Sequence, residues 1–401
     1  MRRSTTALAV TVASLAALLG SPASVAEEPA ARSGGASGFP PRVERALDEI
    51  IKTGMAASDT PGMAAGVWIP GRGKYAKAFG VADTTTGRPF RLNDHVRIAS
   101  ITKSFTATAV LQLVDRGRLR LGDTLSSYVR GIPNGRTITV RQLLNMTAGV
   151  YDYTMDEAFG RAFDRDPLMA FGPRDAIRIV KRNEPSFAPG EGVSYSDSNY
   201  VLLGLIVQRV TDRSLGQVIR HRILKPLGMS HTSYPTGSAM PDPHARGYVE
   251  AADGSLRDVT RINPGVAIGA GAMISTLGDL RIWARALAKG TLLSRETHRK
   301  QLMAVPFPGQ VLDVGYGLGI LDINDFLGHN GAIYGFGSAM FHLPRANATI
   351  VVESNLSSNF SGVPTSVFYG IANYLFPRQF ESSKAGSRLG AGAAEQLLTP
   401  R

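Results

Sequence analysis

The chain has 401 residues, of which 43% are hydrophobic and 19% charged, and this apolar content excludes a disordered or fibrous protein. Cysteine is absent, so disulfides, zinc–thiolate sites, iron–sulfur clusters and a cysteine nucleophile are excluded as well. The net charge of +12 comes mostly from scattered arginines without interleaved aromatic residues. We therefore expect a solvated basic surface that favours an anionic envelope, and no nucleic-acid partner.

The first 26 residues have the pattern of a signal peptide. Arg2 and Arg3 precede an apolar stretch over 7–20, and small residues at 24–26 offer a cleavage site. The stretch is short for the ~20 residues that span a bilayer, so we expect cleavage rather than an uncleaved anchor. Residues 27–38 have the composition of a flexible linker. We therefore expect a secreted, extracytoplasmic protein.

Hydrophobic patterns predict strands near both ends of the chain and helices between them. Expected strands cover 63–69, 75–81, 314–323, 326–331, 337–343 and 349–354, and the main expected helices begin at Pro41 and cover about 100–115, 200–210 and 364–375. This order predicts an α+β domain over 39–378, with a sheet built from both ends and a mainly helical lobe inserted at about 120–265. Residues 379–401 are expected to form a flexible tail.

Several catalytic classes lack their motifs. There is no G-x-S-x-G elbow for an α/β-hydrolase, and no phosphate-binding or dinucleotide-binding glycine loop. The seven histidines include no i, i+2 or i, i+4 pair with a carboxylate partner. We therefore expect neither a metal site nor a cofactor.

One nucleophile motif is present, in the sequence Ser100-Ile101-Thr102-Lys103. Residues i and i+3 share a helix face, so the Lys103 amine can reach the Ser100 hydroxyl and act as its base. A serine at a helix start also directs a backbone N–H and the helix dipole at a developing oxyanion. Without other motifs, a helix cap would be the more common role of Ser100.

Two later segments favour a catalytic role for Ser100 over a helix cap. Tyr195, in Tyr195-Ser196-Asp197, lies on an expected turn before a helix, and a buried tyrosine beside a lysine can shuttle protons. His329-Asn330-Gly331 ends an expected strand, where a glycine allows close approach of substrate and the N–H of Ala332 can join that of Ser100 in an oxyanion hole. Singly, Tyr195 and His329 would most often be packing residues.

The order S-x-x-K, Y-x-N-like, H-x-G resembles the serine β-lactamase and penicillin-binding-protein superfamily. Flanking segments extend the resemblance to its class C β-lactamase-related branch, and within it to exported D-alanyl-D-alanine carboxypeptidases, over about residues 40–376. These segments are RIASITKSFTATAVLQLVDRGRLRLGDTL, TITVRQLLNMTAGVYDYT, APGEGVSYSDSNYVLLG, PLGMSHTSY, GAGAMISTLGDL and LGHNGAIYGFGSA. The resemblance implies an antiparallel sheet flanked by helices beside a largely helical lobe.

The resemblance also implies roles for residues. Ser100 would accept the acyl group, and Lys103 and Tyr195 would share the general-base and general-acid work. The N–H groups of Ser100 and Ala332 would form the oxyanion hole, with Gly331 beside them. Asp197 and His329 would take the substrate-binding positions of the second-motif amide and the third-motif cation.

Two residues depart from the pattern of class C β-lactamases. His329 replaces their lysine and is commoner in carboxypeptidase, esterase and D-aminopeptidase relatives. Asp197 replaces asparagine, so it lacks the NH₂ donor for a substrate carbonyl. Its charge would also favour a charged Lys103, which strengthens Tyr195 as the base.

We therefore expect an exported serine hydrolase, foremost a penicillin-binding D-alanyl-D-alanine carboxypeptidase. Its substrate would be a peptidoglycan stem peptide or a small acyl compound, with β-lactams as inhibitors or substrates, and we expect a monomer. The alternatives are an esterase, a β-lactamase or a D-aminopeptidase on the same scaffold, and a non-catalytic protein that binds β-lactams or cell wall. A sensor of that last kind would not need Ser100, Lys103 and Tyr195 together. Tyr151, Asp152 and Tyr153 either line the cleft or form a surface turn.

Overall fold

The computed structural model describes residues 38–307, 313–357 and 362–380. The predicted signal peptide, all but the last residue of the predicted linker, and positions 381–401 of the predicted tail lie outside these residues. Gln379 and Phe380 are buried on the folded body, where Gln379 donates to the carbonyl oxygen of Asn324. The body therefore reaches two residues beyond the expected boundary at 378.

The main sheet of the described residues is antiparallel and joins both ends of the chain, as predicted. Its strand order is β3-β2-β1-β13-β12-β11-β10-β9-β8, and β1 pairs with β13 so that Met63 lies opposite Ser354. The bounds are β1 Gly62–Ile69, β2 Gly73–Asp83, β3 Arg88–Pro89, β8 Val305–Pro306, β9 Val314–Tyr316, β10 Leu321–Ile323, β11 Phe326–Ile333, β12 Phe336–Leu343 and β13 Ala348–Ser354. The expected single strand over 314–323 is thus two strands.

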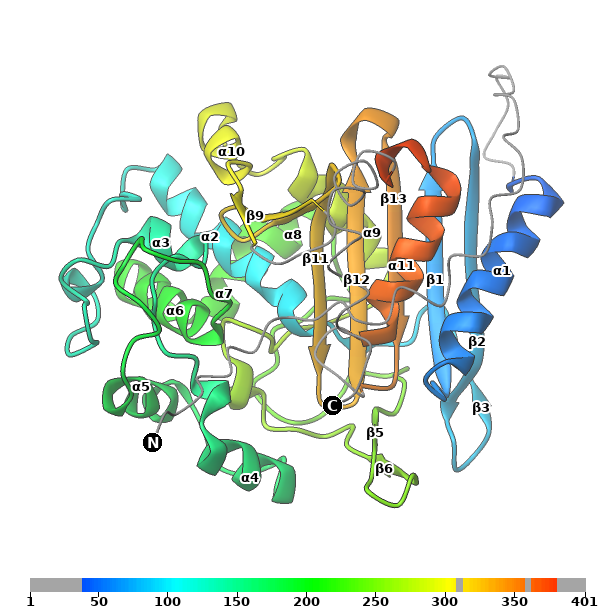
Figure 1. Cartoon of the computed structure of the whole chain (residues 1–401), viewed down its shortest axis with the longest axis horizontal. Coiled ribbons are helices and arrows are strands. Elements are labelled where there is room, and N and C mark those ends of the chain that lie inside the picture. The colour runs from blue at the N-terminus through cyan, green and yellow to red at the C-terminus, as the bar shows by residue number, and fades with distance from the viewer. Residues whose placement is uncertain (1–37, 308–312, 358–361, 381–401) are drawn as a thin grey trace, which may run out of the picture.

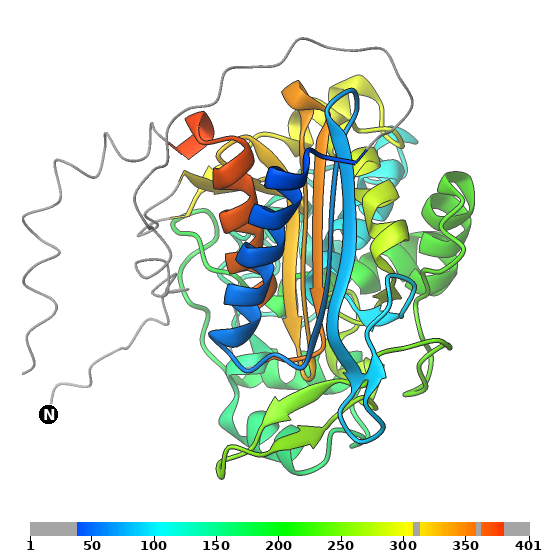
Figure 2. The ribbon, with the colours of Figure 1, turned by 90° about the vertical axis from the view of Figure 1, so that its right-hand side faces the viewer.

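Helices cover both faces of this sheet, as Figures 1 and 2 show. Helices α1 (Pro41–Ala56) and α11 (Gly362–Leu375) pack together on one face, and α9 (Leu277–Ala288) packs on the other. Every residue of β1, β12 and β13 is buried as a result. This explains why the apolar residues of these strands do not alternate with exposed polar ones, although β12 includes His342 and β13 ends in Glu353 and Ser354.

The helical lobe lies at the β9 side of the sheet (Figure 1). Its helices are α2 Thr102–Asp115, α3 Val140–Leu144, α4 Glu157–Arg165, α5 Pro173–Arg182, α6 Asp197–Thr211, α7 Leu215–Ile219, α8 Lys225–Leu227 and α10 Arg295–Gln301. The first, α2, is buried along nearly its whole length and packs against α6 and α7. Two small two-stranded sheets complete the fold, β4 (Val96–Arg97) with β7 (Ile274–Ser275) and β5 (Tyr248–Glu250) with β6 (Leu256–Asp258).

Candidate active site

Ser100 lies in a 3₁₀ turn, η1 (Ala99–Ile101), immediately before α2. The S-x-x-K motif therefore crosses from a 3₁₀ turn into an α-helix, rather than lying within one helix as expected. Neighbouring segments hold the turn on both sides: the N–H of Ile98 donates to the Met273 carbonyl at 3.0 Å, and the Ser338 hydroxyl donates to the Ile98 carbonyl at 3.0 Å. Ala99 has a φ of 47°, a left-handed conformation that costs energy for a residue with a Cβ.

Lys103 is fully buried and makes three polar contacts. Its Nζ donates to Ser100 Oγ at 3.0 Å, to the carbonyl oxygen of Ala270 at 3.0 Å and to the carboxylate of Asp197. The amine also lies 4.7 Å from the centre of the Tyr195 ring. All three donor positions of the ammonium are thus used, and the cation is fixed against the nucleophile.

The segment around GAGAM explains how the Lys103 amine is held. Gly269 has a φ of 75°, and a Cβ there would lie 2.3 Å from the Tyr200 carbonyl oxygen, so only glycine fits. The Gly269 carbonyl in turn accepts from the Thr106 hydroxyl at 2.8 Å, and the Met273 N–H donates to the Thr102 hydroxyl at 3.1 Å. These bonds fasten the segment along the first turn of α2, which aims the Ala270 carbonyl at Lys103.

Tyr195 and Asp197 reach the site from the start of α6. Asp197 is the first residue of that helix, where its negative charge is favoured by the helix dipole. Burial, followed by the charge of Asp197, holds the pKa of Tyr195 well above its usual value, although a hydrogen bond with Ser100 acts in the opposite direction. Asp197 was expected to strengthen Tyr195 as the base. The structure shows instead that Asp197 raises the pKa of Tyr195 and so opposes its ionisation, because the carboxylate lies close to both Lys103 and Tyr195.

A second carboxylate, Asp152, lies beside Asp197. Burial, followed by the charge of Asp197, raises the pKa of Asp152 to about 7. Its Oδ1 accepts from the backbone N–H of Thr154 at 3.1 Å, and the next residue, Tyr153, donates its N–H to the Ser198 hydroxyl at 2.9 Å. The loop before α4 is thus fastened to the start of α6, and Asp152 belongs to the site rather than to a surface turn.

His329 is fully buried on β11. Its Nδ1 lies 2.6 Å from the carbonyl oxygen of Asn330 and its Nε2 lies 3.0 Å from the hydroxyl of Tyr316. A carbonyl only accepts, so Nδ1 carries the proton and Nε2 accepts from Tyr316. Burial and then the charge of Lys103 lower the pKa of His329 to about 3. The imidazole is therefore neutral and does not supply the positive charge implied by the family resemblance.

Gly331 and Ala332 lie on a free edge of β11. The last pair between β10 and β11 is Leu321 with Gly328, so within the described residues no strand pairs with this edge from His329 onward. Turn η1 packs there instead. A Cβ added to Gly331 would lie 2.7 Å from both the Ser100 nitrogen and the Ile98 carbonyl oxygen. The edge therefore brings backbone N–H groups close to Ser100, as an oxyanion hole requires.

The predicted site residues thus come together from η1, α2, α6 and β11. Sequence analysis did not identify Tyr316 of β9, whose ring meets that of Tyr195 edge-on at 6.2 Å and whose hydroxyl contacts His329. It follows a glycine in a glycine-rich segment and carries no local signal of function. That Asp152 lies beside Asp197 was not predicted either.

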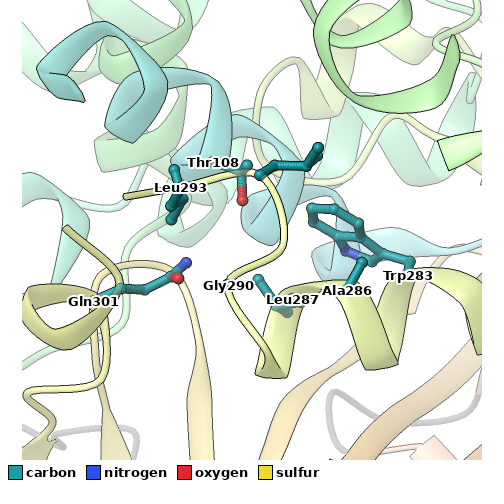
Figure 3. A pocket seen from close by; sticks show the side chains of 8 residues that line it. Thr108, Trp283, Ala286, Leu287, Gly290, Leu293 and Gln301 are labelled. Carbon is teal, nitrogen blue, oxygen red and sulfur yellow. The ribbon is translucent and has the colours of Figure 1, made fainter. Parts of the chain in front are cut away.

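Two hollows elsewhere are not lined by these residues. One, in Figure 3, lies between α2, α9 and α10, has a volume of about 10 Å³ and is lined by Thr108, Trp283, Gln301 and neighbouring residues, which leaves room for about one water molecule. The other has a volume of about 490 Å³ and is lined by Arg295, His298 and Arg299. In the described part of the chain, no three acidic or histidine side chains are grouped to hold a metal ion, and no helix there is long and apolar enough to span a bilayer.

Comparison with known proteins matches the part of the chain that forms the sheet, the helical lobe and the candidate site. The family model described as Beta-lactamase matches residues 47–366. The chain belongs to the β-lactamase family. This family of serine hydrolases shares the fold described above, so the antiparallel sheet flanked by helices is confirmed.

Three relatives of this β-lactamase-family chain are informative. Protein flp of Staphylococcus aureus is 30% identical over 79% of the chain and 64% of its own length, so the chain spans less than two thirds of this curated relative. A D-stereospecific amidohydrolase from Streptomyces sp. is 31% identical, with a TM-score of 0.74 over 83% of this chain and 98% of its own. The D-amino acid amidase of Ochrobactrum anthropi SV3 is 26% identical, with a TM-score of 0.73 over 86% and 99%.

Proposed function

We propose that this serine hydrolase is exported and cleaves the amide bond that follows a D-amino acid residue with a free α-ammonium group. The observation that carries the proposal is the charge of the site. Its one cation, Lys103, is already paired with Asp197, a second carboxylate at Asp152 has no ion-pair partner among the described residues, and His329 is neutral. Such a site attracts a cationic group and repels a carboxylate.

Two structural relatives support the D-configuration and the amide bond. The titles of their solved structures name a D-stereospecific amidohydrolase and a D-amino acid amidase, and each aligns over more than four fifths of this chain. An α-ammonium is only two bonds from the carbonyl carbon that Ser100 would attack. A carboxylate at Asp197, hydrogen-bonded to the lysine that contacts Ser100, lies within that reach.

The proposed chemistry uses each side chain in the charge state that its surroundings favour. Ser100 Oγ attacks the substrate carbonyl and passes its proton to Lys103 as the lysine passes one to Asp197. The N–H groups of Ser100 and Ala332 stabilise the oxyanion. Tyr195, a neutral phenol, protonates the leaving nitrogen and regains a proton from Lys103, which Asp197 reprotonates, and the C–N bond breaks to leave an ester on Ser100. Water then hydrolyses this ester, with Tyr195 and Lys103 acting in reverse.

A D-alanyl-D-alanine carboxypeptidase is the second candidate. It is favoured by the six ordered segments of the penicillin-binding-protein resemblance and by the signal-peptide pattern of residues 1–26, which would place the enzyme beside peptidoglycan. Its substrate carries a free carboxylate close to the scissile bond, and the paired Lys103 and neutral His329 offer that carboxylate little attraction. Acylation by β-lactams and a monomeric state are further parts of this candidate that stay predictions.

A substrate panel separates the two candidates. D-Phenylalanine amide, its N-acetyl derivative, L-phenylalanine amide and N-acylated D-alanyl-D-alanine would be compared by kcat/KM at pH 8. We expect the free D-amide to be preferred over its N-acetyl derivative by about 10-fold or more, because the ammonium interacts with Asp152 and Asp197. Asp152→Asn should remove most of that preference and leave the N-acetyl derivative little changed.

Asp156 offers a matched control variant on the loop that carries Asp152. Its carboxylate is already paired with Arg182, so Asp156→Asn should leave the preference for the free D-amide unchanged. Faster release of D-alanine from the N-acylated dipeptide than of ammonia from D-phenylalanine amide would contradict the proposal and favour the carboxypeptidase. Equal rates for D- and L-phenylalanine amide would contradict the proposed selectivity for a D-amino acid residue.

A further inference from the structure

A chain of buried hydroxyl and imidazole groups lies behind the catalytic residues and has no part in the chemistry described above. His329 of β11 contacts the hydroxyl of Tyr316 of β9 at 3.0 Å. That hydroxyl lies 3.4 Å from the hydroxyl of Tyr200 of α6, which donates to the Leu144 carbonyl oxygen at 2.9 Å. All three side chains are buried, so the chain links the sheet to the helical lobe across the start of α2.

Backbone carbonyl groups determine the direction of the hydrogen bond at each end of this chain. The Asn330 carbonyl holds the proton on His329 Nδ1, and the Leu144 carbonyl takes the proton of Tyr200. The single proton of Tyr316 therefore faces two acceptors, and the shorter contact is with His329 Nε2. This leaves the imidazole without a free lone pair, because one nitrogen donates and the other accepts.

The ring of Tyr316 has a second contact set. It meets the Tyr195 ring edge-on, with centres 6.2 Å apart at 84°, and the His329 ring at 5.6 Å and 87°. The Lys103 amine lies 4.7 Å from the centre of the Tyr195 ring and 5.8 Å from that of Tyr200. Tyr195 is thus in contact with both the amine and the ring of Tyr316, and these contacts limit its rotation.

We propose that Tyr316 is a positioning residue for the acyl-transfer reaction: its hydroxyl keeps His329 in the neutral Nδ1–H form, and its ring holds Tyr195 against Lys103. The proposal rests on the roles given above to Ser100, Lys103 and Tyr195.

A neutral His329 matters because a second cation there would repel Lys103. Among the charged groups on the described elements around β11, Lys103 is the one whose field reaches the imidazole, and the other titratable groups in contact are Tyr316 and, through it, Tyr200 and Tyr195. Removing the Tyr316 proton donor would free the Nε2 lone pair, so that only burial and the charge of Lys103 would oppose protonation. Protonated His329 would then weaken the hydrogen bonds of Lys103 with Ser100 and Asp197.

Two substitutions separate the hydroxyl from the ring. In Tyr316→Phe the ring stays, so we expect kcat at pH 9 to fall only about 3-fold, while the acid limb of the pH–kcat profile moves to higher pH by about one unit. In Tyr316→Leu both contacts are lost, and kcat should fall about 100-fold at every pH. A second substitution, His329→Asn, removes the titrating group and should return the acid limb of Tyr316→Phe to its wild-type position.

A readout without turnover tests the hydroxyl separately. The imidazole signals of His329, assigned by comparison with His329→Asn, should show no protonation between pH 5 and 8 in the wild type and should titrate in Tyr316→Phe. Tyr369→Phe, a buried tyrosine of α11 outside the site, is the matched control. If Tyr316→Phe keeps the acid limb of the wild-type pH–kcat profile and its His329 does not titrate, the proposal is overturned even if the variant is active. A wild-type protein that no substrate acylates would overturn the proposed function instead. The titration of His329 would then still test whether the Tyr316 hydroxyl keeps the imidazole neutral.

Discussion

Gly331→Ala is expected to abolish most of the activity while the chain remains folded. The added Cβ would lie 2.7 Å from the Ser100 nitrogen and the Ile98 carbonyl oxygen and 2.9 Å from the Ala99 Cβ, distances at which backbone has to move. Either η1 or the edge of β11 shifts, and both carry N–H groups of the proposed oxyanion hole. Since loss of one such donor costs about 100-fold or more in kcat, we expect kcat/KM to fall at least that far.

Gly160→Ala on α4 is the control for this substitution, because a Cβ there meets no atom within 4 Å and alanine favours a helix. It should keep both the melting temperature and kcat/KM. Melting curves of both variants show whether the loss in Gly331→Ala is local. Activity of folded Gly331→Ala within about 3-fold of the wild type would contradict the placement of the oxyanion hole.

Lys103→Met is expected to lower the acylation rate about 1,000-fold or more, because Ser100 loses its proton acceptor. The side chain is fully buried, so methionine retains much of its volume, but Asp197 keeps a charge without its partner. We therefore expect a lower free energy of unfolding at pH 8 as well. Rates of acyl-enzyme formation and urea unfolding curves measure the two effects separately.

The double variant Lys103→Met/Asp197→Asn separates catalysis from stability. Replacing the unpaired carboxylate by an amide should recover most of the unfolding free energy, whereas acylation should stay absent. Recovery of acylation in the double variant, or acylation of Lys103→Met within about 10-fold of the wild type, would contradict the role of Lys103 as the base.

The sequence predicted well those contacts that depend on local spacing. Ser100 and Lys103 are three residues apart and meet as expected, although a 3₁₀ turn rather than an α-helix carries the serine. Strand and helix patterns also predicted that both ends of the chain would share one sheet, since buried strands such as β1 are apolar throughout. Resemblance to the family brought Tyr195, Asp197 and His329 to the same site, which no local pattern could have done.

Charge states could not be predicted, because they depend on what surrounds a group in three dimensions. His329 was expected to replace a cation, but burial and the charge of Lys103 lower its pKa to about 3 and keep it neutral. Asp197 was expected to favour Tyr195 as the base, but it lies close enough to the phenol to oppose its ionisation. Asp152 and Asp197 are far apart in the sequence, and their mutual repulsion arises only when the loop before α4 packs on α6.

The same electrostatics connect the fold to the choice of substrate. One ion pair, one additional carboxylate and a neutral imidazole surround Ser100, whereas the third-motif lysine of class C β-lactamases would add a positive charge. Asp152 and His329 thus change the charge of the site in the same direction. This change of charge is the basis of the proposed preference for substrates with a positive rather than a negative group near the scissile bond.

The central claim is that Ser100 is the residue that becomes acylated, and active-site labelling tests it most directly. The wild type, Ser100→Ala and the control Ser127→Ala, which alters an exposed serine, would be treated with a fluorophosphonate, a reagent that reacts with activated serines whatever their acyl specificity. We expect one adduct per chain by intact mass in the wild type and in Ser127→Ala, on the peptide that contains Ser100, and none in Ser100→Ala. An adduct that persists in Ser100→Ala, or no adduct in the wild type, would contradict the account.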